Sequence, residues 1–273
     1  MQMVHFTEKL IQNGAPTRES LGEKQVQCEA HGGYTSAGNR YMGKREIWTG
    51  CPACEDQRLA SERQAEAKAK ADAQQRRIEA MIEESAIPAR FIGRTFENFQ
   101  AVTPDQENAL KVVQAFADNF DKHVKNGTGL ILSGLPGTGK SHLAGAVLQH
   151  ILPAHAGLYI TCMGIIRAIR GTWRKDSEKS ESQILSMLCD VPLLVIDEIG
   201  VQYGTDGEQT ILFDVLDRRY REMMPSILLT NQNRDGFKSC VGDRTFDRLT
   251  QSCKWVQFDW ASYRLTARKL EAA

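Results

Sequence analysis

A glycine-rich segment, Gly134-Leu-Pro-Gly-Thr-Gly-Lys140-Ser141, carries the clearest chemistry of this sequence. It matches the pattern G-x-x-x-x-G-K-[ST] between an apolar run expected to form a strand and a periodic run, residues 142–152, expected to form a helix. Glycines let backbone N–H groups surround a phosphate chain, and the helix N-terminus adds partial positive charge. Lys140 suits the β- and γ-phosphates of ATP or GTP, and the Ser141 hydroxyl suits Mg²⁺. The residues expected to bind the nucleotide here are Gly134, Pro136, Gly137, Thr138, Gly139, Lys140, Ser141 and His142.

An apolar run that ends in two carboxylates, Leu193-Leu-Val-Ile-Asp197-Glu198, forms the second motif. Asp197 is suited to Mg²⁺ coordination, usually through water, and Glu198 to polarising the water that attacks the γ-phosphate. This pair favours a hydrolysing enzyme over a nucleotide kinase. A later apolar run ends in Thr230-Asn231, where the amide could orient the attacking water; the alternative is an asparagine that only serves a turn.

Two pairs of metal-ligand residue types, Cys28-Glu-Ala-His31 and Cys51-Pro-Ala-Cys54, lie near the start of the chain. Each pair can place two ligands on one tight turn, and three cysteines with one histidine form a known structural Zn²⁺ set. Residues 32–50 alternate turn residues with aromatic ones, as a small hairpin between the two turns would. The pattern predicts a zinc site. A redox C-x-x-C at Cys51 and Cys54, or no shared role, are the alternatives.

Composition limits the class of protein. The 273 residues contain 34 Lys+Arg and 34 Asp+Glu, so any nucleic-acid contact must come from a local basic patch. No apolar stretch approaches the ~20 residues of a membrane span, and the polar N-terminus is not a secretory signal. The seven cysteines form no even framework, which favours a reducing cytoplasm.

Three zones follow one another along the chain: residues 1–55, a charged helical linker at 56–86 rich in Ala, Glu, Gln, Lys and Arg, and an α/β domain at 87–273. In the linker, Ile78, Met81 and Ile82 could dock. The last zone alternates apolar strands with helices, which predicts a parallel sheet covered on both faces. The expected strands are Gly129–Ser133, Leu158–Thr161, Leu193–Asp197, Ile227–Thr230 and Trp255–Phe258.

The segments GLPGTGKS, LLVIDEIG, LLTN, VGDRTFDRL and FDWASYR, in this order, resemble the AAA+ (P-loop ATPase) domain of the DnaC/DnaI helicase loaders. The lead-in IPARFIGRTFENF is also similar, so the resemblance covers roughly residues 87–265. It implies ATP as the nucleotide and a five-stranded sheet of order 5-1-4-3-2. It also implies that Asn231 senses the γ-phosphate, that Arg244 reaches the ATP of a neighbouring subunit, and that Arg264 contacts the nucleotide as sensor 2.

The same resemblance implies a function and partners. The protein is expected to load a replicative hexameric helicase onto single-stranded DNA, as a spiral oligomer that forms with ATP. Residues 1–55 would bind the helicase; their zinc set is more similar to DnaI and to phage-encoded loaders than to DnaC. A basic segment with an aromatic residue would contact the DNA; a solvated amphipathic helix and loop is the alternative. That segment contains Arg167, Arg170, Trp173, Arg174 and Lys175.

Three other functions fit parts of the sequence. A transposition helper ATPase of the IstB type shares this core and also assembles on DNA, although the cysteine-containing front region argues against it. An adaptor that uses ATP as a switch would need little hydrolysis, which Glu198 and Asn231 argue against. A small-molecule kinase would need an acceptor pocket and an arginine-bearing lid, and the sequence indicates neither.

Overall fold

The computed structural model describes residues 18–41, 43–201 and 205–263. The chain divides into two compact units, Met1–Gln75 and Arg76–Ala273, and the division falls within a helix, α1 (Pro52–Glu84). This division lies inside residues 56–86, the segment expected to be a linker.

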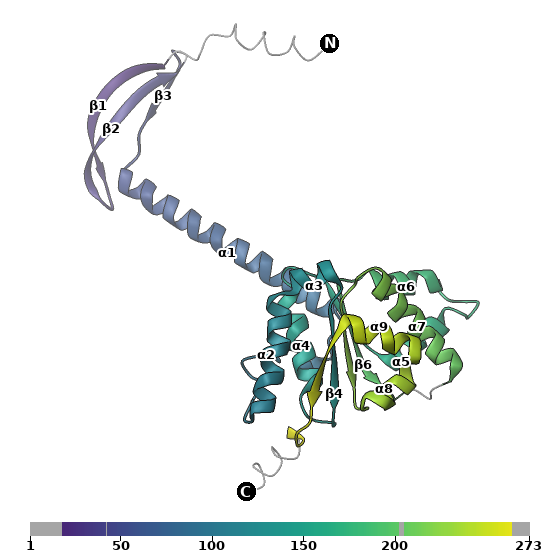
Figure 1. Ribbon diagram of the computed structural model, residues 1–273. Coiled ribbons are helices and arrows are strands. Elements are labelled where there is room, and N and C mark those ends of the chain that lie inside the picture. Colours follow the sequence, from purple (N-terminus) through teal and green to yellow (C-terminus); the bar gives the residue numbers. More distant parts are fainter. Residues whose placement is uncertain (1–17, 42, 202–204, 264–273) are drawn as a thin grey trace. The chain divides into compact units, whose positions relative to one another are not determined.

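The first unit contains a three-stranded antiparallel sheet of order β1-β2-β3 (Figure 1). Strands β2 (Gly32–Tyr41) and β3 (Arg45–Trp48) form the hairpin expected between the two ligand pairs. Strand β1 (Arg18–Cys28) was not expected, because its polar residues RESLGEKQVQC carry little apolar alternation. It pairs with β2 along its whole length and ends at the first cysteine.

Few side chains are buried in this sheet. Trp48 packs across Gly38, where an added Cβ would come within 2.7 Å of the indole ring. The Ser36 hydroxyl donates to the Thr49 carbonyl at 2.6 Å, and Ala37 N donates to Thr49 Oγ1 at 2.9 Å. These contacts fix the chain where it leaves β3 toward Cys51. Among the described residues of this unit, Cys51 is the only buried hydrophobic side chain.

Helix α1 buries no residue and carries ion pairs along its surface, such as Arg58 with Glu62 at 2.8 Å. It begins four residues before the expected linker and therefore includes Cys54. It ends before Ala86, whose φ of 54° is left-handed, and before Pro88. Of the three residues near its C-terminal end that were expected to dock, Met81 and Ile82 pack against the core of the second unit, whereas Ile78 is not among the residues that pack there.

The second unit contains a parallel sheet of order β5-β6-β7-β4-β8. Counted from β4 as the first strand, this is the expected order 5-1-4-3-2. All five expected strands are present, with ends that differ by two residues or fewer. They are β4 (Gly129–Gly134), β5 (Gly157–Thr161), β6 (Leu193–Ile199), β7 (Ser226–Thr230) and β8 (Cys253–Phe258).

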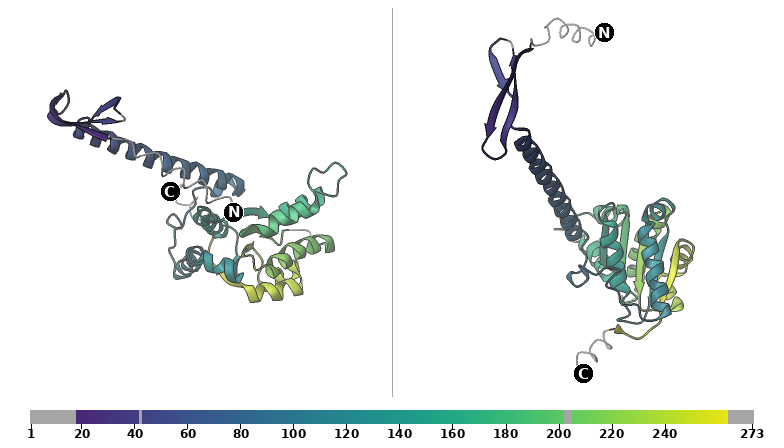
Figure 2. Two further views of the ribbon diagram at one scale, coloured as in Figure 1. Left: turned by 90° about the horizontal axis from the view of Figure 1, so that it is seen from above. Right: turned by 90° about the vertical axis from the view of Figure 1, so that its left-hand side faces the viewer.

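Alternate side chains of the strands enter two apolar layers, one on each face of the sheet. In β4, Leu130 and Leu132 join one layer, whereas Ile131 joins the other. Helices therefore cover both faces, as expected (Figure 1; further views in Figure 2). The first face carries α2 (Pro104–Asp118), α3 (Phe120–Asn126) and α4 (Lys140–Ile151); the second carries α5 (Cys162–Gly171), α6 (Glu181–Asp190), α7 (Asp206–Arg221), α8 (Arg234–Val241) and α9 (Asp243–Ser252).

The lead-in segment, which includes a short 3₁₀ helix, η1 (Ala89–Phe91), runs from α1 to α2. Among the residues that the structure describes, none of the helices combines the length and apolar character that a membrane span needs.

Candidate active site and metal centre

The glycine-rich loop joins the carboxyl end of β4 to the N-terminus of α4. Two glycines make this turn possible. Gly134 has φ of 149°, and a Cβ there would lie 2.1 Å from the Phe258 carbonyl oxygen; Gly139 has φ of 99°, and a Cβ there would meet the Phe99 ring at 2.5 Å. The first turn of α4 thus points its N–H groups toward the loop, as a phosphate-binding site requires.

Hydrogen bonds hold the loop in shape. Lys140 is 6% exposed, and its ammonium group donates to the carbonyls of Gly134 at 2.7 Å and Leu135 at 2.8 Å. Residues after β8 support the loop from the other end of the chain. Trp260 Nε1 donates to the Thr138 carbonyl at 3.0 Å, and Tyr263 N donates to the Gly137 carbonyl at 3.0 Å. The loop therefore presents its lysine from a fixed backbone.

Asp197 lies beside the first turn of α4. Strand β7 lies between β6 and β4, and the carboxyl ends of these parallel strands meet at the same edge of the sheet. The Oδ2 atom of Asp197 accepts a hydrogen bond from Ser141 Oγ at 3.0 Å and another from the buried Tyr159 hydroxyl on β5. Ser141 and Asp197 thus bring two hard oxygen ligands together, and Mg²⁺ prefers such ligands. The pair predicted for magnesium fits that ion. Tyr159 was missed, because a tyrosine in an apolar strand gives no catalytic signal.

Glu198 has an unusual backbone. Its φ of 60° lies in the left-handed region, and the pairing of β6 with β7 shifts between Ile196 and Ile199. Its N–H donates to Asp197 Oδ1 at 2.7 Å, and the Thr230 hydroxyl donates to the Ile199 carbonyl at 2.7 Å. The carboxylate is exposed in the cavity that the loop also lines. Such strain is typical of functional positions.

One cavity of about 740 Å³ collects most of the predicted nucleotide residues. Gly134 is not among its lining residues but contributes the carbonyl that Lys140 contacts. The lead-in segment was quoted only for its resemblance, yet it forms one wall through Arg94 and Phe99. The predicted residues that line the cavity are Pro136, Gly137, Thr138, Gly139, Lys140, Ser141, His142, Asp197, Glu198 and Asn231.

His142 lines the cavity and also fastens the lead-in segment. Its Nε2 donates to the Thr95 carbonyl at 2.8 Å, and its ring meets the Phe99 ring edge-on at 5.4 Å. Burial, followed by the charge of Arg94, lowers the pKa of His142, although the bond to Thr95 opposes this shift. The ring is therefore neutral near pH 7. Direct contact between His142 and a nucleotide stays a prediction.

The two predicted arginines are not part of the described cavity wall. Arg244 lies exposed on α9, with its guanidinium 5.4 Å from the centre of the Phe213 ring. A role toward a neighbouring subunit stays a prediction. Arg264 lies outside the described residues.

The basic segment runs through α5 and into the turn after it. Trp173 is 62% exposed, and its Nε1 donates to Glu181 at 2.7 Å. Arg167, Arg174 and Lys175 are exposed. Arg170 is exposed as well, but its guanidinium pairs with the buried carboxylate of Glu208 at 3.4 Å, which reduces its availability for a DNA phosphate.

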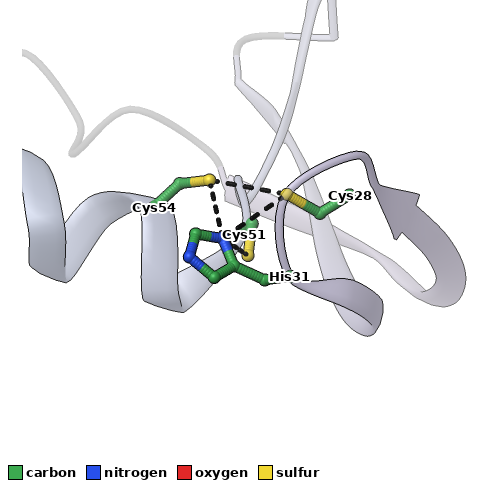
Figure 3. A group of neighbouring side chains, drawn as sticks. All are labelled: Cys28, His31, Cys51 and Cys54. Carbon is green, nitrogen blue, oxygen red and sulfur yellow. Dashed lines mark hydrogen bonds between the residues drawn. The ribbon is translucent and has the colours of Figure 1, made fainter.

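The four predicted metal ligands come together in the first unit (Figure 3). Cys28 ends β1, His31 lies in the turn that follows, Cys51 precedes α1, and Cys54 lies in its first turn. Their ligand atoms all lie within 4.8 Å of one another. His31 Nδ1 is 3.2 Å from Cys54 Sγ and 3.8 Å from Cys51 Sγ, and the sulfurs of Cys28 and Cys54 are 3.4 Å apart.

These separations suit a tetrahedral ion, since four ligands at about 2.0–2.3 Å from Zn²⁺ lie roughly 3.3–3.8 Å from each other. Before any ion binds, two of the thiols differ in acidity. Hydrogen bonds, first from His31, lower the pKa of Cys28 to about 6, and the hydrogen bond with Cys28 raises that of Cys54 to about 11. The two share a proton that a divalent ion would replace. The residues form a candidate Cys₃His metal site.

Comparisons with known proteins agree with this architecture. A profile of the family described as IstB-like ATP binding protein matches residues 55–272. The replicative helicase loader DnaC of Escherichia coli (strain K12) is 39% identical over 172 residues, which cover 62% of this chain and 69% of that protein.

Solved structures share the fold. A crystal structure of the DnaC helicase loader superposes with a TM-score of 0.57 at 21% identity, covering 62% of this chain and 98% of that chain. The replication initiator DnaA bound to AMPPCP and single-stranded DNA gives 0.55 at 20% identity, covering 68% and 56%. The profile and the 39% identity to DnaC decide the family: the chain belongs to the IstB-like ATP-binding proteins, as an AAA+ ATPase of the DnaC helicase-loader type.

Proposed function

We propose that this protein uses ATP to load a replicative hexameric helicase onto single-stranded DNA. The 39% identity to DnaC, a replicative helicase loader, carries the proposal. It is supported by a cavity in which Lys140, Asp197, Glu198 and Asn231 face one space. An adaptor with little hydrolysis would not need Glu198 in its strained position. We also propose that the protein works in the cytoplasm.

ATP would bind along the loop, with its phosphates at the N-terminus of α4. Lys140 would offset their negative charge, and Ser141 and Asp197 would hold Mg²⁺, directly and through water. When bound, Mg²⁺ stabilises the charge that develops on the phosphate oxygens. Glu198 would take a proton from the attacking water, and the Asn231 amide would orient that water.

Hydrolysis would be controlled by assembly. Arg244 is exposed on α9 and lies outside the cavity wall, so its guanidinium is available to a second copy of the chain. An arginine supplied by a neighbour stabilises transition-state charge only when the subunits meet around ATP. ATP would thus favour a spiral oligomer, and hydrolysis would release it.

DNA binding would use the exposed part of the basic segment. Arg167, Arg174 and Lys175 can contact phosphates, and the exposed face of Trp173 can stack on a base. The pairing of Arg170 with Glu208 leaves that arginine a smaller part than the sequence suggested.

The first unit would bind the helicase. We propose Zn²⁺ as its metal, because three thiolates and one imidazole form a soft, closed set suited to a structural ion. A rigid hairpin fixed by the metal would present side chains of β1–β3 to the partner. A redox role for Cys51 and Cys54 would leave Cys28 and His31, which lie against them, without a purpose.

A loading assay tests the proposal. The candidate helicase is offered closed circular single-stranded DNA, and unwinding of an annealed strand is measured with the protein, ATP and Mg²⁺. Wild-type protein should increase unwinding. Glu198→Gln should bind ATP normally but fall about 100-fold or more in turnover, since a general base contributes roughly 10²–10⁴-fold. No gain in unwinding with wild-type protein would reject helicase loading.

Arg244→Ala tests the shared site. It should keep ATP affinity and lose hydrolysis, and mixing it with Lys140→Ala should restore part of the turnover, because each variant supplies what the other lacks. Absence of any restored turnover would count against an arginine supplied by a neighbour.

The IstB-type transposition helper shares the family profile, but the DnaC relationship favours a helicase as partner. Co-purification with a tagged helicase or a tagged transposase, with and without ATP, separates the two functions.

A further inference from the structure

The carboxylate of Asp197 is held by donors on both of its oxygens. Oδ1 accepts from the Glu198 N–H at 2.7 Å. Oδ2 accepts from Ser141 Oγ at 3.0 Å and from the Tyr159 hydroxyl. Ser141 is itself an expected Mg²⁺ ligand, and the backbone bond to Glu198 is local. Tyr159 is therefore the side chain that orients this carboxylate without being expected to touch the metal.

Tyr159 is well fixed for that role. It is 4% exposed, lies on β5, and pairs in register with Val195 of β6, two residues before Asp197. In the bond to Asp197 the phenol is the donor, because an ionised carboxylate can only accept hydrogen bonds.

The same residue contacts the end of the linker helix. β5 is an edge strand of the sheet, and the Tyr159 N–H on its open side donates to the Ser85 carbonyl at 2.7 Å. Ser85 is 1% exposed and follows α1 directly. The Phe91 ring, just beyond, lies 6.2 Å from the Tyr159 ring. One residue thus touches both the docked end of α1 and the Asp197 carboxylate.

We infer that Tyr159 is a positioning residue for the magnesium site, and that it couples the docking of the C-terminal end of α1 to the orientation of Asp197. When α1 is docked, the Ser85 bond holds β5 and keeps the phenol on Asp197. When that end loosens, the carboxylate loses a donor and Mg²⁺ binds less well. Docking of the end of α1 and binding of Mg²⁺ with the nucleotide then strengthen each other.

Tyr159→Phe tests the first half, because it removes one hydroxyl and keeps the ring. ATP affinity is measured by equilibrium fluorescence with a labelled nucleotide, in EDTA and across a Mg²⁺ titration. We expect unchanged affinity in EDTA and a Mg²⁺ requirement about tenfold higher, as for a lost hydrogen bond to a charged group. Tyr220→Phe is the matched control, since it removes a hydroxyl bonded to Gln251 and should leave the Mg²⁺ titration unchanged.

Several outcomes would overturn the role of Tyr159. An unchanged Mg²⁺ titration in a folded Tyr159→Phe protein would do so, and so would an equal loss of ATP affinity with and without Mg²⁺, which would indicate a general packing defect. If Tyr159→Phe does not fold, Tyr159→Leu fills the apolar site without the hydroxyl and must give the same Mg²⁺ shift. The inference rests on the proposed ATP site; wild-type protein that binds no ATP would reject that site itself.

A double-mutant cycle tests the coupling. Met81→Ala with Ile82→Ala removes the side chains that pack the end of α1 against the core. Alone, this pair should raise the Mg²⁺ requirement about threefold. Combined with Tyr159→Phe it should add nothing, because the hydroxyl through which α1 acts is already missing. Additive shifts, or no shift from the α1 pair, would overturn the coupling.

Discussion

The two regions that carry candidate chemistry hold their side chains in opposite ways. In the second unit, Asp197 and Glu198 lie at the carboxyl end of the buried strand β6 and Lys140 lies at the N-terminus of α4, and two apolar layers pack against the sheet that holds them. In the first unit, the described sheet is polar on most of its surface, and Cys51, which follows the sheet, is the one buried hydrophobic side chain among the described residues of that unit. The hydrophobic core positions the residues of the ATP site, whereas the metal site must itself contribute to the stability of the first unit.

The two sites should therefore respond differently when a ligand is removed. A small sheet cannot bury enough apolar surface to fold alone, so the free energy of metal binding becomes free energy of folding. At the ATP site, the strands and helices that hold the residues fold without the nucleotide, so nucleotide binding contributes little to the stability of the fold. Removing a ligand should therefore unfold one unit and leave the other folded.

The largest effect is expected from loss of the metal. Chelation, or Cys51→Ser, should abolish the native structure of β1–β3, because structural Zn²⁺ contributes about 10–16 kcal/mol in small domains. Amide hydrogen exchange should show loss of protection in residues 18–50, while ATP affinity stays unchanged. Cys240→Ser, a cysteine outside the metal set, is the control. Full metal content and protected amides in Cys51→Ser would contradict the assignment.

Loss of the loop lysine should have the opposite effect, because it should weaken ATP binding and leave the first unit folded. Lys140→Ala removes an ammonium group that contacts phosphates, and ATP affinity should fall about 100-fold, as for a strong charge-assisted contact. The metal content and the hydrogen exchange of residues 18–50 should not change. Lys122→Ala, on the surface of α3, controls for a simple loss of charge. Wild-type affinity in Lys140→Ala would contradict the site.

Much of this arrangement could be predicted because its signals are local. The loop, the acidic strand and the C-x₂-H and C-x₂-C pairs are short patterns whose spacing fixes their geometry, and the apolar runs marked all five strands of the parallel sheet. The order of those strands came from the resemblance to helicase loaders, since periodicity alone does not order strands.

Other features depend on distant packing and left no local trace. Strand β1 is polar and exists because β2 pairs with it. Tyr159 reaches Asp197 only through the register of β5 with β6, and Arg170 is occupied by a glutamate 38 positions later in the chain. The lead-in wall of the cavity, with Arg94 and Phe99, likewise forms only when the chain folds back over α4.

A smaller effect should separate backbone packing from ligand contact within the ATPase unit. In Gly134→Ala, a Cβ would lie 2.1 Å from the Phe258 carbonyl oxygen at a φ of 149°. The unit should lose about 2–4 kcal/mol of stability, the range of strain and overpacking, or roughly 4–16 °C in Tm. Gly207→Ala is the matched control, because nothing lies within 4 Å of its added Cβ. Equal melting of the two variants would show that β4 and β8 are less closely packed than described.

The smallest effect concerns pH and again distinguishes the units. Burial lowers the pKa of His142 in the folded chain, so between that pKa and the ordinary value of about 6.5 the unfolded chain binds more protons. Stability of the ATPase unit should therefore be complete above pH 6.5 and decline as the pH falls below it. His123, whose pKa burial also lowers, adds to this decline. His142→Gln keeps a donor for the Thr95 carbonyl and removes the titration, so its Tm should fall less steeply between pH 7 and pH 5 than that of the wild type. Identical slopes would mean that His142 is protonated as easily in the folded chain as in the unfolded one, and that it does not fasten the lead-in segment as a neutral ring.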